Sequence, residues 1–146
     1  SPRGGLPGFV KVVNENCIII PDSKGNNRLD SLVNIIETKQ VGCLFLIPGV
    51  DETLRINGRG RISTSTAHLK QFSHHKNPPK ACIEIRIKEV FLHCAKALMR
   101  SKLWSADAKL ERSKFPTIAT MLNDQLCLSE PPESQATMVA RYQQDL

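Results

Sequence analysis

The sequence predicts a small, mainly β protein: a mixed β-barrel with short helices at its periphery. Three observations lead to this prediction. The length of 146 residues fits one ordinary domain. Several strand-sized segments are apolar or alternate between apolar and polar residues. Turn-forming residues separate these segments. No run approaches the roughly 20 apolar residues that a membrane-spanning helix needs, so no membrane association is expected.

The expected strands are residues 9–13, 17–20, 41–47, 54–62 and 83–92. The first two are β-branched runs separated by Asn14-Glu15-Asn16, which predicts a hairpin. The third is apolar throughout and is predicted to be buried on both faces. The fourth and fifth alternate apolar and polar residues. Gly58 and Gly60, which lie on the apolar side of the fourth, indicate a close approach of another part of the backbone.

The expected helices are residues 28–37, 63–72, 93–100, 115–128 and 133–146. Asn27 is expected to cap the first, with Asp30 in an arrangement close to a capping box. Ser63 or Ser65 is expected to cap the second. The fourth opens with Pro116 near its first position, where proline is tolerated.

The composition limits the class of partner. A formal charge of +6 and a pI near 9.2 indicate an acidic partner: a nucleic acid, an anionic lipid surface or a phosphorylated small molecule. Dispersed basic residues and 5% aromatic residues disfavour nucleic acid. The five cysteines show no paired spacing, which predicts free thiols and a cytoplasmic protein. No zinc-site spacing, GxGxxG or P-loop pattern occurs, which disfavours a metal site, a Rossmann domain and an NTPase.

The first candidate site is Gly25-Asn26-Asn27-Arg28, where a polar loop meets the first expected helix. A helix N-terminus offers unpaired N–H groups and a positive dipole end to a phosphate. Arg28 adds a bidentate donor, and the asparagine side chains add neutral donors. From the residues alone, a capped surface helix with a solvated Arg28 is the alternative.

The second candidate site is His93, Lys96 and Arg100, which would share one face if residues 93–100 are helical. Such a basic stripe could meet a phosphate or the electron-rich edge of a flavin ring, and a solvated basic face is the alternative. Cys94 lies beside it, either as an activated thiolate or as a structural thiol.

Several short motifs occur in a characteristic order: SPRG (1–4), GFV (8–10), PD (21–22), GNNRLDSL (25–32), FLIPG (45–49), ETLRING (52–58), STST (63–66), FLHCAKAL (91–98) and LW (103–104). Their order and spacing resemble the pyridoxamine 5′-phosphate oxidase-like flavoproteins, and most closely a bacterial subgroup. The resemblance covers about residues 1–104. It implies an FMN-binding split β-barrel of Greek-key type over that range. Residues 105–146, which differ from the family, are expected to form a C-terminal helical extension.

The resemblance also implies a homodimer with FMN at the subunit interface. The residues expected around the flavin phosphate are Ser1, Arg3, Asn26, Asn27 and Arg28. The residues expected from the second subunit are His93, Lys96 and Trp104. A hydrogen bond from Lys96 to the carbonyl edge of the ring would tune its electronics, while the cofactor carries the redox chemistry.

Two departures from the family narrow the expected function. The helix and two strands that normally precede the Ser-Pro-Arg position are expected to be missing from this chain, and so is the pyridoxal phosphate-binding pattern of the true oxidase. The expected function is therefore an FMN-dependent oxidoreductase of unknown small-molecule substrate, and the pyridoxamine phosphate oxidase reaction itself is disfavoured. The alternatives are the deazaflavin F420 or haem on the same barrel, with His93 as a conceivable axial ligand, and a non-enzymatic flavin-binding protein.

Overall fold

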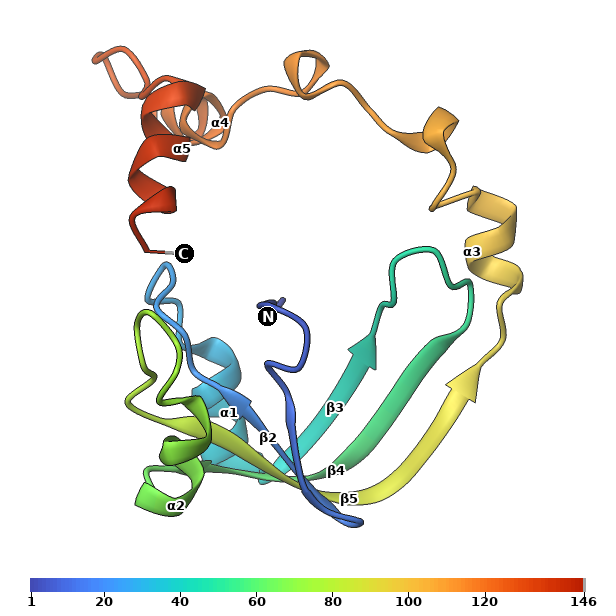
Figure 1. Cartoon of the computed structure of the whole chain (residues 1–146). Coiled ribbons are helices and arrows are strands. Elements are labelled where there is room, and N and C mark those ends of the chain that lie inside the picture. The colour runs from blue at the N-terminus through green and yellow to red at the C-terminus, as the bar shows by residue number, and fades with distance from the viewer. Residues whose placement is uncertain (146) are drawn as a thin grey trace.

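The computed structural model describes residues 1–145 and confirms a mainly antiparallel sheet with helices around it (Figure 1). The strands are β1 (Lys11–Asn14), β2 (Cys17–Pro21), β3 (Gln40–Phe45), β4 (Thr53–Ser63) and β5 (Cys82–His93). They form one five-stranded sheet in the order β1-β2-β5-β4-β3. This arrangement is consistent with the split barrel that the resemblance implies.

The helices are α1 (Asp30–Thr38), α2 (Thr66–Leu69), α3 (Lys96–Ser101), α4 (Ile118–Leu126) and α5 (Gln135–Gln143). Short 3-10 helices are η1 (Lys70–Phe72), η2 (Ala106–Ala108) and η3 (Arg112–Lys114). Within residues 1–145, every helix is too short or too polar to cross a bilayer.

The predicted hairpin is confirmed, since β1 and β2 pair antiparallel on either side of Glu15. The close backbone approach at Gly58 is confirmed as well. The register between β4 and β5 shifts between Asn57 and Gly58, and a Cβ at Gly58 would lie 2.2 Å from the main-chain oxygen of Arg86. Only glycine fits this bulge without moving the backbone of the neighbouring strand.

The prediction that residues 41–47 form a strand buried on both faces is wrong. The strand ends at Phe45, lies at the edge of the sheet beyond β4, and alternates between exposed and half-buried residues. Leu44 is 54% exposed and Leu46, just after the strand, 52% exposed. An apolar run shows only that its side chains tolerate burial, whereas the order of the strands decides how many faces are covered.

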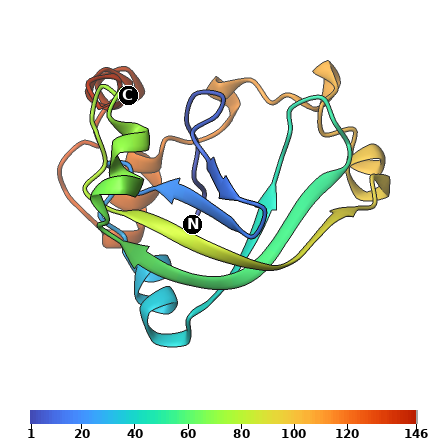
Figure 2. The same cartoon turned by 60° about the horizontal axis from the view of Figure 1, so that its bottom comes forward.

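The core lies on one face of the sheet, at the end where α1 packs. Its buried members are Ile18, Ile20, Ile35, Ile56, Ile83 and Ile85. On the opposite face, Ile19, Phe72 and Cys82 form a smaller cluster beneath η1. Figure 2 shows that α1 and α2 cover the same end of the long β4–β5 pair from opposite sides. The regular alternation of apolar residues places the two clusters on opposite faces.

The expected N-cap of the first helix is wrong. Helix α1 begins at Asp30, its N-cap is Leu29, and no side chain caps it. Asn27 instead adopts a left-handed conformation with φ of 58°, and the side chain of Asn26 accepts a hydrogen bond from the Arg28 N–H at 3.0 Å. Asparagine side chains stabilise such turns as readily as they cap helices, so the turn delays the helix by two residues.

The expected helix over residues 93–100 starts too early. His93 is the last residue of β5, where it pairs with Thr53, and α3 begins only at Lys96. Ladder hydrogen bonds to β4 therefore extend the strand through a segment whose spacing resembles a helix. The predicted helical face of His93, Lys96 and Arg100 does not exist.

Three other helices are shorter than expected. Ser65 is the N-cap of α2 but makes no side-chain capping bond, and Ser63 belongs to β4. Helix α4 begins at Ile118 because the side chain of Thr117 caps it, so Pro116 precedes the cap rather than occupying the first turn. Helix α5 covers Gln135–Gln143, and Leu146 lies outside the described residues.

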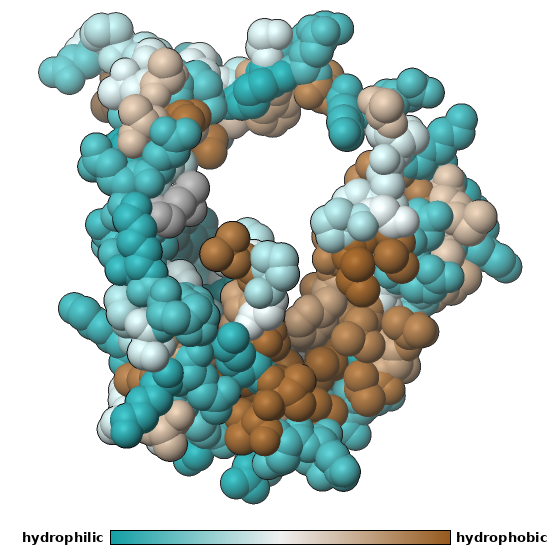
Figure 3. Space-filling view, viewed as in Figure 1, coloured by the Kyte–Doolittle hydropathy of each residue, from teal (hydrophilic) through white to brown (hydrophobic). Residues whose placement is uncertain are grey.

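Beyond α3, the chain leaves the sheet and curves round to return beside the loop that follows β2 (Figure 1). Figure 3 shows an opening between this C-terminal segment and the sheet, with apolar surface over the strands that border it. Two of the β5 residues at the α3 end, Val90 and Leu92, are 56% and 67% exposed.

Candidate functional site

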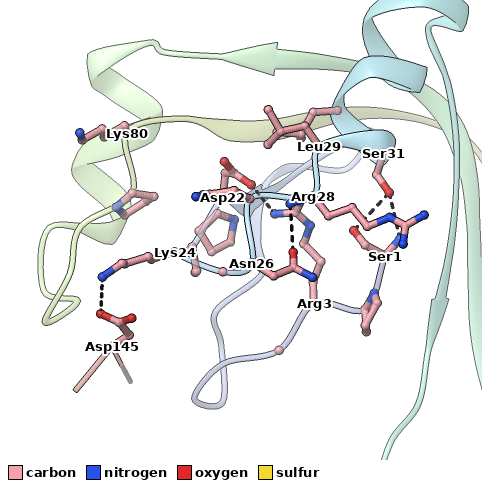
Figure 4. A pocket seen from close by; sticks show the side chains of 18 of the residues that line it. Ser1, Arg3, Asp22, Lys24, Asn26, Arg28, Leu29, Ser31, Lys80 and Asp145 are labelled. Atoms are coloured by element: carbon pink, nitrogen blue, oxygen red, sulfur yellow. Dashed lines mark hydrogen bonds and ion pairs between the residues drawn. The ribbon is translucent and has the colours of Figure 1, made fainter. Parts of the chain in front are cut away.

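A cavity of about 1180 Å³ lies beside the N-terminal end of α1. Three separate segments supply its wall: residues 1–4, residues 21–32 and residues 77–80, together with Phe9 and Asp145. Figure 4 shows the side chains of these segments around one space. The cavity therefore depends on the fold, since its segments are far apart in the sequence.

The end of β2 positions the middle wall. The strand stops at Pro21, and the N–H of Asp22 then donates to the main-chain oxygen of Ala81 at 3.0 Å. This bond fixes the start of the loop to the residue before β5. The turn at Asn26 and Asn27 then leads into α1, and Arg28 stands at this junction.

Two arginine–aspartate pairs dominate the electrostatics of the cavity. Arg3 Nη1 donates to Asp22 Oδ1 at 2.6 Å, and Arg28 Nε donates to Asp30 Oδ2 at 2.6 Å. The hydrogen bond and the charge of Asp30 raise the pKa of Arg28. Because a guanidinium has five N–H donors, each arginine keeps donors for a further ligand.

The cavity carries a small excess of positive charge. The ionisable side chains that line it, within the described residues, are Arg3, Lys24, Arg28, Lys80, Asp22, Asp30 and Asp145. Four bases against three carboxylates leave one positive charge. Lys24 Nζ donates to Asp145 Oδ1 at 2.6 Å, so the C-terminal segment reaches the rim of the cavity (Figure 4).

The five residues expected around a phosphate all line this cavity: Ser1, Arg3, Asn26, Asn27 and Arg28. The Ser31 hydroxyl donates to Ser1 Oγ at 3.1 Å, which places residue 1 against the start of α1. Asp22, Lys24 and Lys80 also line the cavity and were not predicted from the sequence. Asp22 and Lys24 could have been predicted, because they are charged residues in the same polar loop as Asn26. Lys80 could not, because it lies much further along the chain and no motif marks it.

The other three expected residues do not line this cavity. His93 and Lys96 lie at the α3 end of β5. The rings of His93 and Phe91 pack edge to face, with their centroids 5.5 Å apart. Trp104 Nε1 donates to the main-chain oxygen of Val50 at 2.8 Å. Trp104 also borders a separate hollow of about 310 Å³, whose other residues are Gly49, Asp51, Met99, Lys102 and Ser105.

Comparison with protein-family models identifies the part of the chain that contains this site. Residues 1–94 match the model described as pyridoxamine 5′-phosphate oxidase. The chain belongs to the pyridoxamine 5′-phosphate oxidase family. The matched region includes all five strands and every residue of the cavity wall except Asp145.

Among solved structures, the chain is similar to HupZ of Group A Streptococcus, crystallised as a tagged protein, at 17% sequence identity and a TM-score of 0.48. The alignment covers 57% of this chain and 68% of HupZ. A variant of HupZ in which one histidine is replaced by alanine gives 17% identity and a TM-score of 0.49, with 58% and 73% covered. These values are too low to bear on function. A search of curated proteins found no match.

Proposed function

We propose that this protein is an FMN-binding flavoprotein and an oxidoreductase whose substrate is a small molecule. The observation that carries the proposal is the cavity, which gathers Ser1, Arg3, Asn26, Asn27 and Arg28 from two separate segments of the family region. These are the residues that the family resemblance implies around a flavin phosphate.

The donors of the cavity suit a phosphate monoester. Arg3 and Arg28 each retain guanidinium N–H groups beyond those given to Asp22 and Asp30, and charge-assisted bonds to phosphate are the strong ones. Asn27 stands beside them at the turn. The volume is ample for a ligand of FMN size, since small-molecule sites usually measure roughly 300–1000 Å³.

We place the flavin ring at a homodimer interface, where the second copy brings its His93, Lys96 and Trp104. This would explain why these residues lie apart from the phosphate cavity in one chain. Their end of the sheet also has exposed apolar side chains, including Val90 and Leu92, as an interface requires. The Trp104 N–H is already bonded to Val50, so its contribution would be the face of the indole ring. FMN when bound would supply hydride and electron transfer, and the protein would bind and orient it.

The first test is binding of FMN and of riboflavin to the purified protein, followed by flavin fluorescence. Arg28→Ala should raise the Kd for FMN about 10- to 100-fold, because hydrogen bonds to charged groups contribute roughly 1.5–3 kcal/mol. The Kd for riboflavin, which has no phosphate, should not change. Arg59→Ala is the matched control, since Arg59 is exposed on β4 outside the cavity and should leave both affinities unchanged.

Equal losses for FMN and riboflavin would contradict the phosphate site. A colourless protein that does not bind micromolar FMN would contradict the whole proposal. A Soret band would indicate haem as the cofactor in place of FMN, and selective binding of F420 would indicate the deazaflavin. Reduction of the bound flavin by NAD(P)H with turnover on an acceptor separates an oxidoreductase from a flavin carrier.

A further inference from the structure

We propose that Asp22 is a positioning residue whose carboxylate holds the Arg3 guanidinium in the direction of the bound phosphate. This inference rests on the proposed function, because it assigns a role within the same phosphate site. It concerns a residue that acts through Arg3, not one that must touch the ligand itself.

The need for positioning arises from the segment that carries Arg3. Residues 1–4 belong to no helix or strand, and the first described strand begins at Lys11. Over the described residues, side-chain hydrogen bonds join residues 1–4 to the rest of the molecule at two places: Ser1 with Ser31, and Arg3 with Asp22. Within that part of the chain, the pair of Arg3 and Asp22 is therefore the only ionic anchor of this segment.

Asp22 is well placed to be the fixed member of the pair. It directly follows Pro21, which pairs with Cys82 in the sheet, and its own N–H is bonded to Ala81. Its side chain is 31% exposed and that of Arg3 is 22% exposed. A partly buried carboxylate on the end of a strand can immobilise a long side chain, whose ordering otherwise costs conformational entropy when the ligand binds.

The second arginine of the cavity lacks such support. Arg28 and Asp30 are two residues apart where the loop meets α1, and their side chains are 76% and 64% exposed. Exposed pairs of this kind contribute little, since solvent screens them and both side chains must be ordered. The two pairs have the same length of 2.6 Å, so their difference lies in burial and in what they connect.

The sign of the mutational effect separates positioning from simple charge. If Asp22 acted only as a negative charge near a phosphate, removing that charge would tighten FMN binding. If it positions Arg3, then Asp22→Asn should raise the Kd for FMN about ten-fold, which corresponds to about 1.4 kcal/mol. The Kd for riboflavin should stay the same, because riboflavin has no phosphate for Arg3 to contact.

Three comparisons complete the experiment. Asp22→Glu keeps a carboxylate and should recover part of the lost FMN affinity. In the background of Arg3→Ala, Asp22→Asn should have no further effect, as a double-mutant cycle would show. Asp30→Asn should change the Kd for FMN less than about two-fold, in keeping with its exposed ion pair.

The matched control is Glu133→Gln, which removes the 2.8 Å ion pair between Glu133 and Arg141, outside the cavity. It should leave the Kd for FMN unchanged. Unchanged or tighter FMN binding in Asp22→Asn would overturn the proposal, and so would an equal loss of riboflavin binding. If Asp22→Asn does not fold, Asp22→Glu is the deciding variant. An Asp22→Glu protein with neither full nor partial affinity for FMN would overturn positioning by a carboxylate. Failure of the unaltered protein to bind FMN would refute the proposed function first.

Discussion

The two ends of strand β5 have the same pattern in sequence and opposite surroundings in the structure. At one end Ile83 and Ile85 are 5% and 0% exposed, whereas at the other Val90 and Leu92 are 56% and 67% exposed. At the first end α1 packs on β4 and η1 covers Cys82, and the cavity beside α1 lies close by. Alternation therefore determines the face of the sheet on which a side chain lies, but not whether anything covers it.

This contrast has a functional meaning under the proposed function. The side chains of the covered end are buried by other parts of the same chain, and this end carries the proposed phosphate cavity. The exposed end carries His93 and is followed by Lys96 and Trp104, the residues that we assign to a flavin ring shared between two copies. The experiments below test how different the two ends are in solution.

A large effect is expected where the two ends join, at the bulge of β4 against β5. Gly58→Ala would place a Cβ 2.2 Å from the main-chain oxygen of Arg86, so one of the two long strands must move. We expect the free energy of unfolding to fall by about 3 kcal/mol, at the upper end of overpacking effects. Urea denaturation followed by circular dichroism measures it.

Gly60→Ala is the control on the same strand. Its Cβ would meet the side chains of Ile35 at 3.1 Å and Val41 at 3.3 Å, which can shift more easily than a backbone. A change within about 1 kcal/mol is expected, because the loss of unfolded-chain entropy offsets part of the crowding. Equal effects at the two glycines would mean that the bulge is not rigid.

A second comparison removes one apolar side chain from each end of β5. Ile85→Ala should lower the free energy of unfolding by about 2–5 kcal/mol, because it leaves a cavity in the core. Leu92→Ala should cost less than about 1 kcal/mol at protein concentrations where the chain is monomeric, because Leu92 is already exposed. A cost for Leu92→Ala that rises with protein concentration would show that a second copy covers this end.

The smallest effect on the protein is expected from cysteine labelling, which requires no substitution in the core. One cysteine lies at each end of β5. Cys82 is buried and Cys94 is exposed. Burial raises the pKa of the Cys82 thiol, partly opposed by its hydrogen bond to Ser63, so less of the reactive thiolate exists near neutral pH. Cys94 should therefore react with a maleimide much faster than Cys82, as peptide mass spectrometry of the labelled protein would show.

The difference between the labelling rates of Cys94 and Cys82 should narrow as the pH rises. The raised pKa of Cys82 means that its thiolate forms only at higher pH. Rapid labelling of Cys82 at neutral pH would indicate that α2 and η1 open readily. Slow labelling of Cys94 at high protein concentration, reversed on dilution, would support the dimer.

The sequence predicted local features whose cause is local. The hairpin of β1 and β2 follows from a polar turn between β-branched runs, and the tight packing at Gly58 follows from a glycine on an apolar strand face. It also predicted a basic, polar junction around Arg28, and this junction lines the cavity of about 1180 Å³. Binding of an anion there stays a prediction. The cofactor assigned to that junction came from the family resemblance rather than from spacing.

Two of the predictions that failed concern competition between local and distant interactions. His93 has helical spacing with Lys96, but pairing with Thr53 on β4 keeps it in a strand. Residues 41–47 are apolar enough for a central strand, yet β3 lies at the edge of the sheet. For His93 the deciding hydrogen bonds come from a segment distant in sequence, and for β3 the order of the strands in the sheet decides, neither of which a short window contains.

By itself, the sequence determined the β-rich class, the hairpin, the positions of the glycine-dependent contacts and the basic junction that opens α1. Only the tertiary structure decided that Arg3 pairs with Asp22, that Lys80 joins the same cavity, and that one end of β5 is covered while the other is bare. The physical reason is that backbone conformation and amphipathicity are properties of neighbouring residues, whereas burial and charge pairing depend on which distant segments the sheet brings together.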